Sequence, residues 1–103
     1  MARDNPSAFD PLLLSQVRLG IMSVLLSRPA ASFSDLKALL TLTQGNLGIH
    51  LQRLEEGGYV SVKKEFVKRK PKTTCRITAK GRKAFLRHVT QLEEIARGNR
   101  DDA

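Results

Sequence analysis

Residues 43–77 read TQGNLGIHLQRLEEGGYVSVKKEFVKRKPKTTCRI, and this stretch decides the fold. Its first part has leucines at 47, 51 and 54, a spacing that places them on one face of a helix. Gly57 and Gly58 supply the left-handed turn that ends such a helix. Two strand-like runs follow, one beginning at Tyr59 and one at 73–77, with a basic tip at 67–72 between them. We therefore predict a helix over 44–56 followed by a two-stranded hairpin, or wing.

Positive charge is concentrated in this hairpin. Six of the ten residues from Lys63 to Lys72 are Lys or Arg, and only Glu65 opposes them. Between residues 63 and 83 ten basic residues face one acidic residue, whereas the rest of the chain has eight basic and nine acidic residues. The formal net charge of +8 favours a polyanionic partner. Charge alone does not separate nucleic acid from an anionic membrane or from simple solubility.

Length and composition predict a single small domain. The chain has 103 residues, 41% of them hydrophobic, which is enough for one modest core. We expect a flexible lead at 1–9, a folded domain at 10–96 and a polar tail at 97–103. The single cysteine excludes an intrachain disulfide, and the N-terminus has no signal-peptide pattern. No apolar run approaches the roughly 18 residues of a membrane span. We therefore expect an intracellular, cytoplasmic protein with no membrane partner.

The remaining elements are mainly helical. Asp10 and Pro11 form a helix-start signal, so a first helix is predicted from there to about Ser27 or Arg28. Residues 31–33 can form a very short strand, and Ser34 is the expected cap of a second helix over 34–42. Thr78 is the expected cap of a long final helix. The predicted fold class is mainly α with a small β wing.

The segments TLTQGNLGIHLQRLEEGGYV and FVKRKPKTTCRITAKGRKAF, in this order of helices and wing, resemble the small winged helix-turn-helix transcriptional regulators of the MarR and ArsR type. The resemblance extends over residues 10–96. It implies a homodimer, built mainly from the first and last helices, that binds double-stranded DNA at a pseudo-palindromic operator as a repressor or an activator. The chain departs from the family pattern at Cys75, where an aromatic residue is common, and at Ile49, where polar or basic residues are more frequent.

In such a protein the third helix enters the major groove. Gln44 and Asn46 lie in its first turn, where each can form a bidentate pair with adenine. Ile49 can pack on a thymine methyl group, and Arg53 can reach a guanine edge or a phosphate. The alternative is that these are ordinary solvated helix residues. For His50 we favour a half-buried, hydrogen-bonding role over base contact. The predicted DNA contacts of this helix are Thr43, Gln44, Asn46, Ile49, Gln52 and Arg53.

The wing is expected to bind the DNA backbone and the minor groove. Arg69 is the preferred minor-groove probe, because a planar guanidinium enters a narrow, negative groove more readily than a hydrated ammonium. Pro71 is expected to stiffen the tip and to stop it continuing as strand. The alternative is a charged edge hairpin that only discourages aggregation. The predicted wing contacts are Lys63, Lys68, Arg69, Lys70 and Lys72.

The two terminal helices carry more apolar surface than a chain of this length needs, which favours a dimer interface. The alternative is that both helices simply enclose one core. An unidentified small-molecule effector is compatible with the resemblance, but no polar cluster identifies its site. The predicted interface residues are Leu13, Val17, Ile21, Phe85, Val89, Leu92 and Ala96.

Other chemistry has little support in the sequence. Cys75 is interpreted as a small packing residue, with a redox-sensing thiol as the alternative, whose pKa Arg76 or Lys80 could lower. The possible metal ligands His50, Cys75 and His88 lack metal-site spacing, so neither metal nor cofactor is expected. Without a nucleophile motif or a phosphate-binding glycine loop, the chain is not expected to be an enzyme. The runner-up function is a winged-helix module for protein–protein or RNA interaction, since fold does not determine function.

Overall fold

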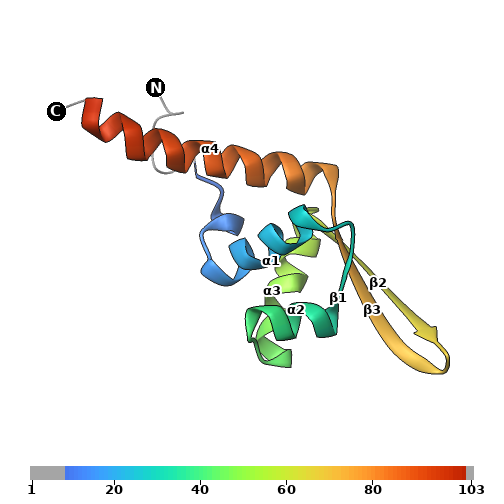
Figure 1. The fold of residues 1–103 in the computed structure, drawn as a ribbon. Coiled ribbons are helices and arrows are strands. Elements are labelled where there is room, and N and C mark those ends of the chain that lie inside the picture. Colours follow the sequence, from blue (N-terminus) through green and yellow to red (C-terminus); the bar gives the residue numbers. More distant parts are fainter. Residues whose placement is uncertain (1–8, 102–103) are drawn as a thin grey trace.

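The computed structural model describes residues 9–101, which form a small helical domain with one antiparallel sheet (Figure 1). The predicted fold class is confirmed. The elements follow in the order η3 (Pro11–Leu13, a 3₁₀ helix), α1 (Gln16–Ser27), β1 (Ala31–Ser32), α2 (Phe33–Leu40), α3 (Gln44–Glu56), β2 (Val60–Val67), β3 (Lys70–Ile77) and α4 (Ala79–Asp101).

The three strands are ordered β1-β3-β2 and pair antiparallel. The two-residue strand β1 pairs only with the base of β3, through Ala31 opposite Cys75 and Ser32 opposite Thr74. The strands β2 and β3 pair along their whole length, from Val60 opposite Ile77 to Val67 opposite Lys70. Beyond its base the wing is therefore a two-stranded hairpin, which projects away from the helices (Figure 1).

The core lies where α1, α2 and α3 meet the base of the sheet. Its fully buried side chains are Leu13, Ile21, Met22, Leu25, Leu36, Leu47, Leu54 and Cys75. Outside this core the molecule is extended, with principal dimensions of 60 × 23 × 22 Å and a radius of gyration of 15.8 Å. A compact domain of this length has a radius of gyration of about 13 Å. The excess comes from two projecting arms, the wing and the distal part of α4 (Figure 1).

The helix α3 has the bounds predicted from the sequence. The Thr43 hydroxyl accepts a hydrogen bond from the Asn46 amide at 3.1 Å, which caps the helix at its start. Leu47, Leu51 and Leu54 are buried, as their spacing predicted. Gly58, with a φ of 82°, reverses the chain into β2. Helix cap, buried face and termination signal all agree with one another here.

The predicted first helix is wrong at its start. Asp10 does cap a helix, since its carboxylate accepts from the Leu12 amide at 3.0 Å, but this is the single turn η3. The Ser15 hydroxyl accepts from the Arg18 amide and begins α1 as a second helix. The Tyr59 hydroxyl also donates to the Asp10 carboxylate, which ties η3 to the base of the wing.

The predicted second helix is also shifted. Its cap is Ser32, not Ser34, because the Ser32 hydroxyl accepts from the Asp35 amide at 3.0 Å. The same residue is the last of β1, so the strand passes directly into α2. The helix ends at Leu40 rather than residue 42, and Thr41 turns the chain toward α3 with a φ of 53°.

The wing tip is shorter than predicted. Lys68 and Arg69, with φ values of 53° and 67°, form a two-residue turn of the kind that matches the twist of a hairpin. Pro71 lies inside β3, opposite Phe66, so the prediction that it would end the strand is wrong. Its position is the second pair from a two-residue turn, where amides point away from the partner strand. Proline therefore costs no ladder hydrogen bond there.

The final helix begins as predicted, because the Thr78 hydroxyl accepts from the Gly81 amide at 2.9 Å. A Cβ at Gly81 would lie 3.0 Å from Tyr59 Cα, so α4 starts in close contact with that backbone. The helix runs on to Asp101, past its expected end at 96. Phe9, expected in the flexible lead, packs edge-on against the buried His88 ring at 6.1 Å between centroids. Residues 1–8 of the lead and 102–103 of the tail lie outside the described residues.

Among the helices described for residues 9–101, none combines the length and the hydrophobicity that a membrane crossing requires.

Candidate DNA-binding surface

The exposed face of α3 carries the side chains that the sequence predicted as DNA contacts. Of these, Ile49 is the exposed apolar residue, with 57% of its surface accessible. The Gln52 amide donates to the Glu56 carboxylate at 3.2 Å, so this side chain is held along its own helix. The full predicted set is exposed on α3 or on its cap: Thr43, Gln44, Asn46, Ile49, Gln52 and Arg53.

His50 connects α3 to α1 instead of facing outward. Its Nδ1 lies 2.9 Å from Nη1 of Arg18 and must accept this hydrogen bond, because a guanidinium only donates. Arg18 also donates from Nε to the Leu12 carbonyl at 2.7 Å. Burial, followed by the charges of Arg18 and Arg53, lowers the pKa of His50 below its usual value. The half-buried, hydrogen-bonding role predicted for this histidine is confirmed.

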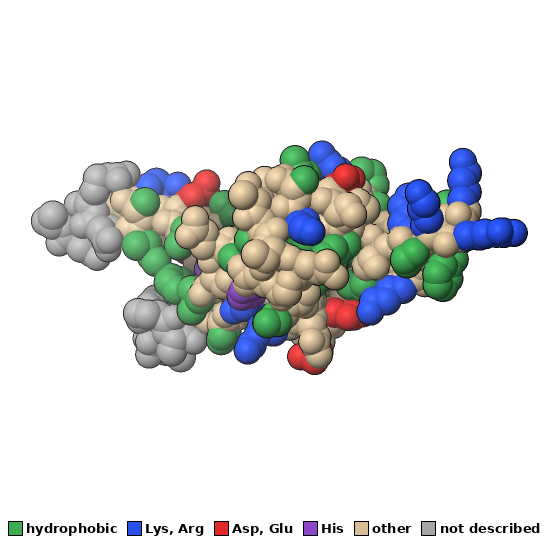
Figure 2. All heavy atoms as spheres, turned by 90° about the horizontal axis from the view of Figure 1, so that it is seen from below, with side chains coloured by type: hydrophobic (Ala, Val, Ile, Leu, Met, Phe, Trp, Pro, Cys, Tyr) green, Lys and Arg blue, Asp and Glu red, His purple; other side chains and the backbone are tan. Residues whose placement is uncertain are grey.

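The wing presents its cations to solvent. Every residue from 65 to 72 is exposed, and Figure 2 shows Lys and Arg side chains standing out from the hairpin end of the molecule. Lys63 approaches Glu65 at 3.9 Å, but both side chains are exposed and such a pair is weak. All five predicted wing contacts are therefore accessible: Lys63, Lys68, Arg69, Lys70 and Lys72.

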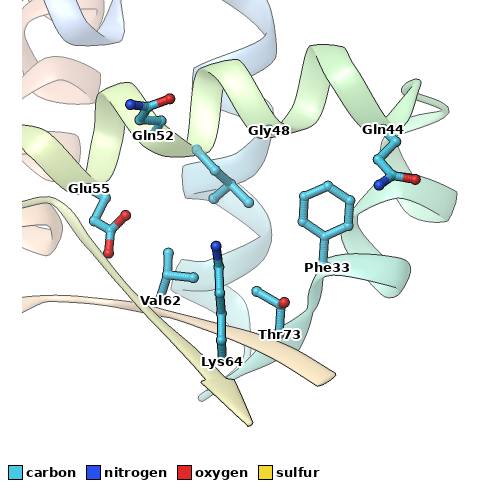
Figure 3. Close-up of a pocket in the computed structure, with 9 residues that line it drawn as sticks. Phe33, Gln44, Gly48, Gln52, Glu55, Val62, Lys64 and Thr73 are labelled. Atoms are coloured by element: carbon cyan, nitrogen blue, oxygen red, sulfur yellow. The ribbon is translucent and has the colours of Figure 1, made fainter. Parts of the chain in front are cut away.

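A groove of about 560 Å³ separates α3 from the wing (Figure 3). The Lys64 side chain extends from β2 across this groove, and the Glu55 side chain lies on its α3 wall (Figure 3). The groove is lined by Phe33, Gln44, Gly48, Leu51, Gln52, Glu55, Val62, Lys64 and Thr73.

Lys64 and Phe66 are two surface residues that the sequence reasoning missed. Side chains alternate between the faces of a strand, so these residues share a face with Val60 and Val62. Val60 is buried in the core, which identifies this face as the one turned toward the domain. The signal was present in the sequence, as a period of two continuing from the buried valines into the basic stretch.

Cys75 belongs to the core. Its side chain is fully buried, between Ala31 on β1 and Val62 on β2 in the strand register. Burial, with a smaller contribution from the Glu55 charge, raises the pKa of the thiol to about 11. The suggestion that Arg76 or Lys80 lowers this pKa is wrong, because burial and the Glu55 charge both raise it. The thiol stays protonated and packs as a small apolar group.

The predicted interface residues divide into three groups according to their exposure. Leu13 and Ile21 are fully buried within this single chain and Phe85 nearly so, so these three belong to its own core and not to an exposed surface. Val17 and Val89 are partly buried against the same core. Only Leu92 and Ala96 of the predicted set are exposed on α4, where Leu86 and Ile95 are exposed as well.

Comparison with known proteins agrees with this geometry. A family model described as a winged helix DNA-binding domain matches residues 17–96. An uncharacterized protein of Methanocaldococcus jannaschii is 40% identical over 83 residues, which cover 81% of this chain and 90% of that protein. A transcriptional regulator homologue from Pyrococcus horikoshii OT3 is 36% identical, with a TM-score of 0.85 over 95% of this chain and 97% of the other.

More distant structures share the fold. A MarR-family transcriptional regulator from Silicibacter pomeroyi is 20% identical, with a TM-score of 0.64, over 88% of this chain and 58% of the other. The chain belongs to the winged helix DNA-binding domain family. Its fold and family are those of transcriptional regulators. Within residues 9–101, no three His, Cys, Asp or Glu side chains are grouped as metal ligands would be.

Proposed function

We propose that this protein is a cytoplasmic, homodimeric transcriptional regulator that recognises a specific sequence in double-stranded DNA. The observation that carries the proposal is the arrangement of two exposed elements around one groove. The polar first turn of α3 lies on one side of the groove, and the cationic wing lies on the other. In duplex recognition, contacts to base edges specify the sequence and contacts to phosphates position the protein. Here a helix can make the first kind of contact and a hairpin the second.

In this proposal α3 reads the major groove. Gln44 and Asn46 are exposed at its N-terminal end and offer the paired donor and acceptor that adenine matches. Ile49 offers an apolar surface to a thymine methyl group one turn further along. Arg53, beyond it, reaches a guanine or a phosphate. The capped N-terminus adds a partial positive charge beside the DNA backbone.

The wing supplies affinity more than sequence choice. Lys68 and Arg69 occupy the turn itself, and Lys70 and Lys72 follow in β3. Their contacts to phosphate release counterions whatever the base sequence. Lys64 adds a cation inside the groove between wing and helix, on the side that faces α3.

Dimerisation is proposed through the distal part of α4. Leu92 and Ile95 lie three residues apart, so they are neighbours on the helix surface, and they are 45% and 42% exposed. The extended shape leaves this part of the helix away from the core (Figure 1). A second copy that covers these side chains would bring two α3 helices to two half-sites. The MarR-type likeness extends the proposal to control by a small-molecule effector of unassigned chemistry.

Selection of bound duplexes from a random pool tests base readout. We expect two inverted half-sites whose centres lie about 10 bp, or a multiple of this, apart. Asn46→Ala should weaken binding to the selected site by about 1–3 kcal/mol per disrupted base pair and should affect random duplex much less. Thr90→Ala, an exposed position on α4, is the matched control. Equal losses on selected and random duplex would make the protein-binding or RNA-binding module the better account.

Light scattering tests the dimer separately. The wild-type protein should show about twice the monomer mass of 11.5 kDa at micromolar concentrations. Leu92→Glu places a charge in the proposed apolar contact and should give the monomer mass. Thr90→Glu adds the same charge to the same helix, about 200° away around its axis, and should leave the dimer intact.

A further inference from the structure

Phe66 is the most exposed large hydrophobic residue in the described part of the chain, with 77% of its surface accessible. It lies one residue before the last of β2, directly opposite Pro71 in β3. In a hairpin closed by two residues this is a non-hydrogen-bonded pair, the type in which opposing side chains come closest. The outer part of the wing therefore carries an apolar pair, here named the wing wedge: Phe66 and Pro71.

The wedge and α3 face the same side. Alternation along the strands places Phe66 and Pro71 on the face that also bears Lys64 and Thr73, and then Val62 and Cys75. Lys64 and Thr73 line the groove against α3. The wedge is the next pair outward from that groove, on the same face of the wing.

The charges around the wedge suit a nucleic acid. Lys68, Arg69 and Lys70 follow within four residues of Phe66, and all of them are exposed. An apolar ring next to a cationic turn on a narrow hairpin has the composition of proteins that enter the minor groove, where cations hold the phosphates and apolar side chains press between base pairs. Figure 2 shows hydrophobic side chains beside the Lys and Arg side chains at this end of the molecule.

We propose that the wing wedge enters the minor groove next to the half-site that α3 reads, and that the Phe66 ring partly unstacks one base step and bends the duplex toward the major groove. This inference rests on the proposed function and deepens it. Insertion of the wedge adds a sequence preference that does not depend on hydrogen bonds to the bases. Pyrimidine–purine steps such as TA unstack most readily, so the wedge prefers a TA step at its contact.

The alternative for the wing is an electrostatic probe without insertion. An arginine that only enters the groove favours an A-tract, whose minor groove is narrow and strongly negative, and whose base steps are stiff. The two modes therefore predict opposite preferences at the same position. A TA step favours the wedge, and an A-tract favours an Arg69 probe.

The test uses the full chain, the selected operator, and two operator versions that differ only at the wing contact, one with a TA step and one with an A-tract. Bending is measured by energy transfer between dyes at the duplex ends. Wild-type protein should bend the TA version and prefer it by about tenfold. Phe66→Ala should remove both the bend and the preference. Phe66→Leu should keep most of each, because leucine also serves as a wedge.

Three controls separate the wedge from the other contributions. The salt dependence of Phe66→Ala should match the wild type, because every cation remains. Its thermal midpoint should also match, because the ring is exposed in the free protein. Lys70→Gln should show the opposite pattern, with a smaller salt slope and an unchanged bend.

Several results would overturn the wedge. If Asn46→Ala abolishes half-site selectivity while Phe66→Ala alters neither bend nor preference, the proposed function stands and the wedge is wrong. If wild-type protein selects no half-sites, the proposed function fails and the wedge fails with it. If Phe66→Ala leaves the DNA complex unchanged but releases the protein from phosphatidylserine vesicles, the exposed ring serves a lipid surface instead.

Discussion

The buried part of α1 and the distal part of α4 both carry large apolar side chains, yet the fold uses them differently. Ile21, Met22 and Leu25 of α1 have almost no exposed surface, whereas Leu92 and Ile95 of α4 keep more than two fifths of theirs. Helical periodicity indicates that an apolar face will be covered, but it does not say whether the core of the same chain or another molecule covers it. The core covers these residues of α1 within one chain, whereas the distal part of α4 and the wing stay exposed, and the proposed function assigns their faces to a second copy and to DNA.

A matched pair of leucine truncations, one in α1 and one in the distal part of α4, tests this difference most directly. Leu25→Ala removes an almost fully buried side chain of α1 and should lower the free energy of unfolding by about 2–5 kcal/mol. Leu92→Ala should change it by less than about 0.5 kcal/mol when the protein is dilute enough to be monomeric. Urea denaturation measures both. A large loss for Leu92→Ala in the monomer would mean that the arm belongs to the core.

A second pair tests where the α4 arm joins the core. Gly81→Ala forces a methyl group against the Tyr59 backbone and should cost about 1–3 kcal/mol. Gly98→Ala lies in the same helix with open space around it and should stabilise by up to about 1 kcal/mol. Thermal unfolding of the two variants gives the comparison. Equal effects would show that α4 does not dock at Gly81.

The Arg18 to His50 hydrogen bond is expected to make stability depend on pH. The folded state lowers the pKa of His50, so the unfolded chain binds the proton more readily, and stability falls as pH drops below about 6.5. Protonation also removes the acceptor that Arg18 uses. His50→Gln keeps an acceptor but does not titrate, so its midpoint should fall less between pH 7 and pH 5. Parallel curves for variant and wild type would contradict this role.

The smallest effect on folding is expected in the wing. Changing Lys70 and Lys72 together to Gln should shift the free energy of unfolding by less than about 0.5 kcal/mol, because both are exposed. The salt slope of DNA binding should fall by about 0.9 for each phosphate that the variant no longer neutralises. Arg97→Gln, on the distal part of α4, is the control and should leave the slope unchanged. An unchanged slope for the double variant would show that these lysines do not touch the DNA.

Local agreement explains why α3 was predicted to the residue. A Thr43 cap, three leucines at helical spacing and a glycine pair all indicate the same thirteen residues, so no distant contact had to decide. The prediction of the first helix was wrong because two residues that can cap a helix lie close together in the sequence. Asp10 and Ser15 both start a helix, and nothing in their own stretch says that the first helix ends after one turn.

The other differences between the predicted and the observed structure arise from contacts that local sequence patterns do not reveal. Ser32 caps α2 because β1 ends there, and β1 exists only because it pairs with Thr74 and Cys75, more than forty residues away. The strand position of Pro71 depends instead on a local feature, the register set by the neighbouring turn at Lys68 and Arg69. Leu13 and Ile21 were placed at a dimer interface because period alone cannot separate a core from a subunit contact.

The hairpin beyond its three-stranded base has an evolutionary consequence. Residues 65–72 are all exposed, so their identities are not constrained by packing against the core. Mutations there can accumulate with little effect on folding, while the buried pair Ala31 and Cys75 keeps the root of the hairpin in place. Under the proposed function, relatives that share this scaffold can therefore vary the affinity and the wing contact without changing the half-site that α3 reads. Exchanging these eight residues between relatives would alter the contact at the wing alone.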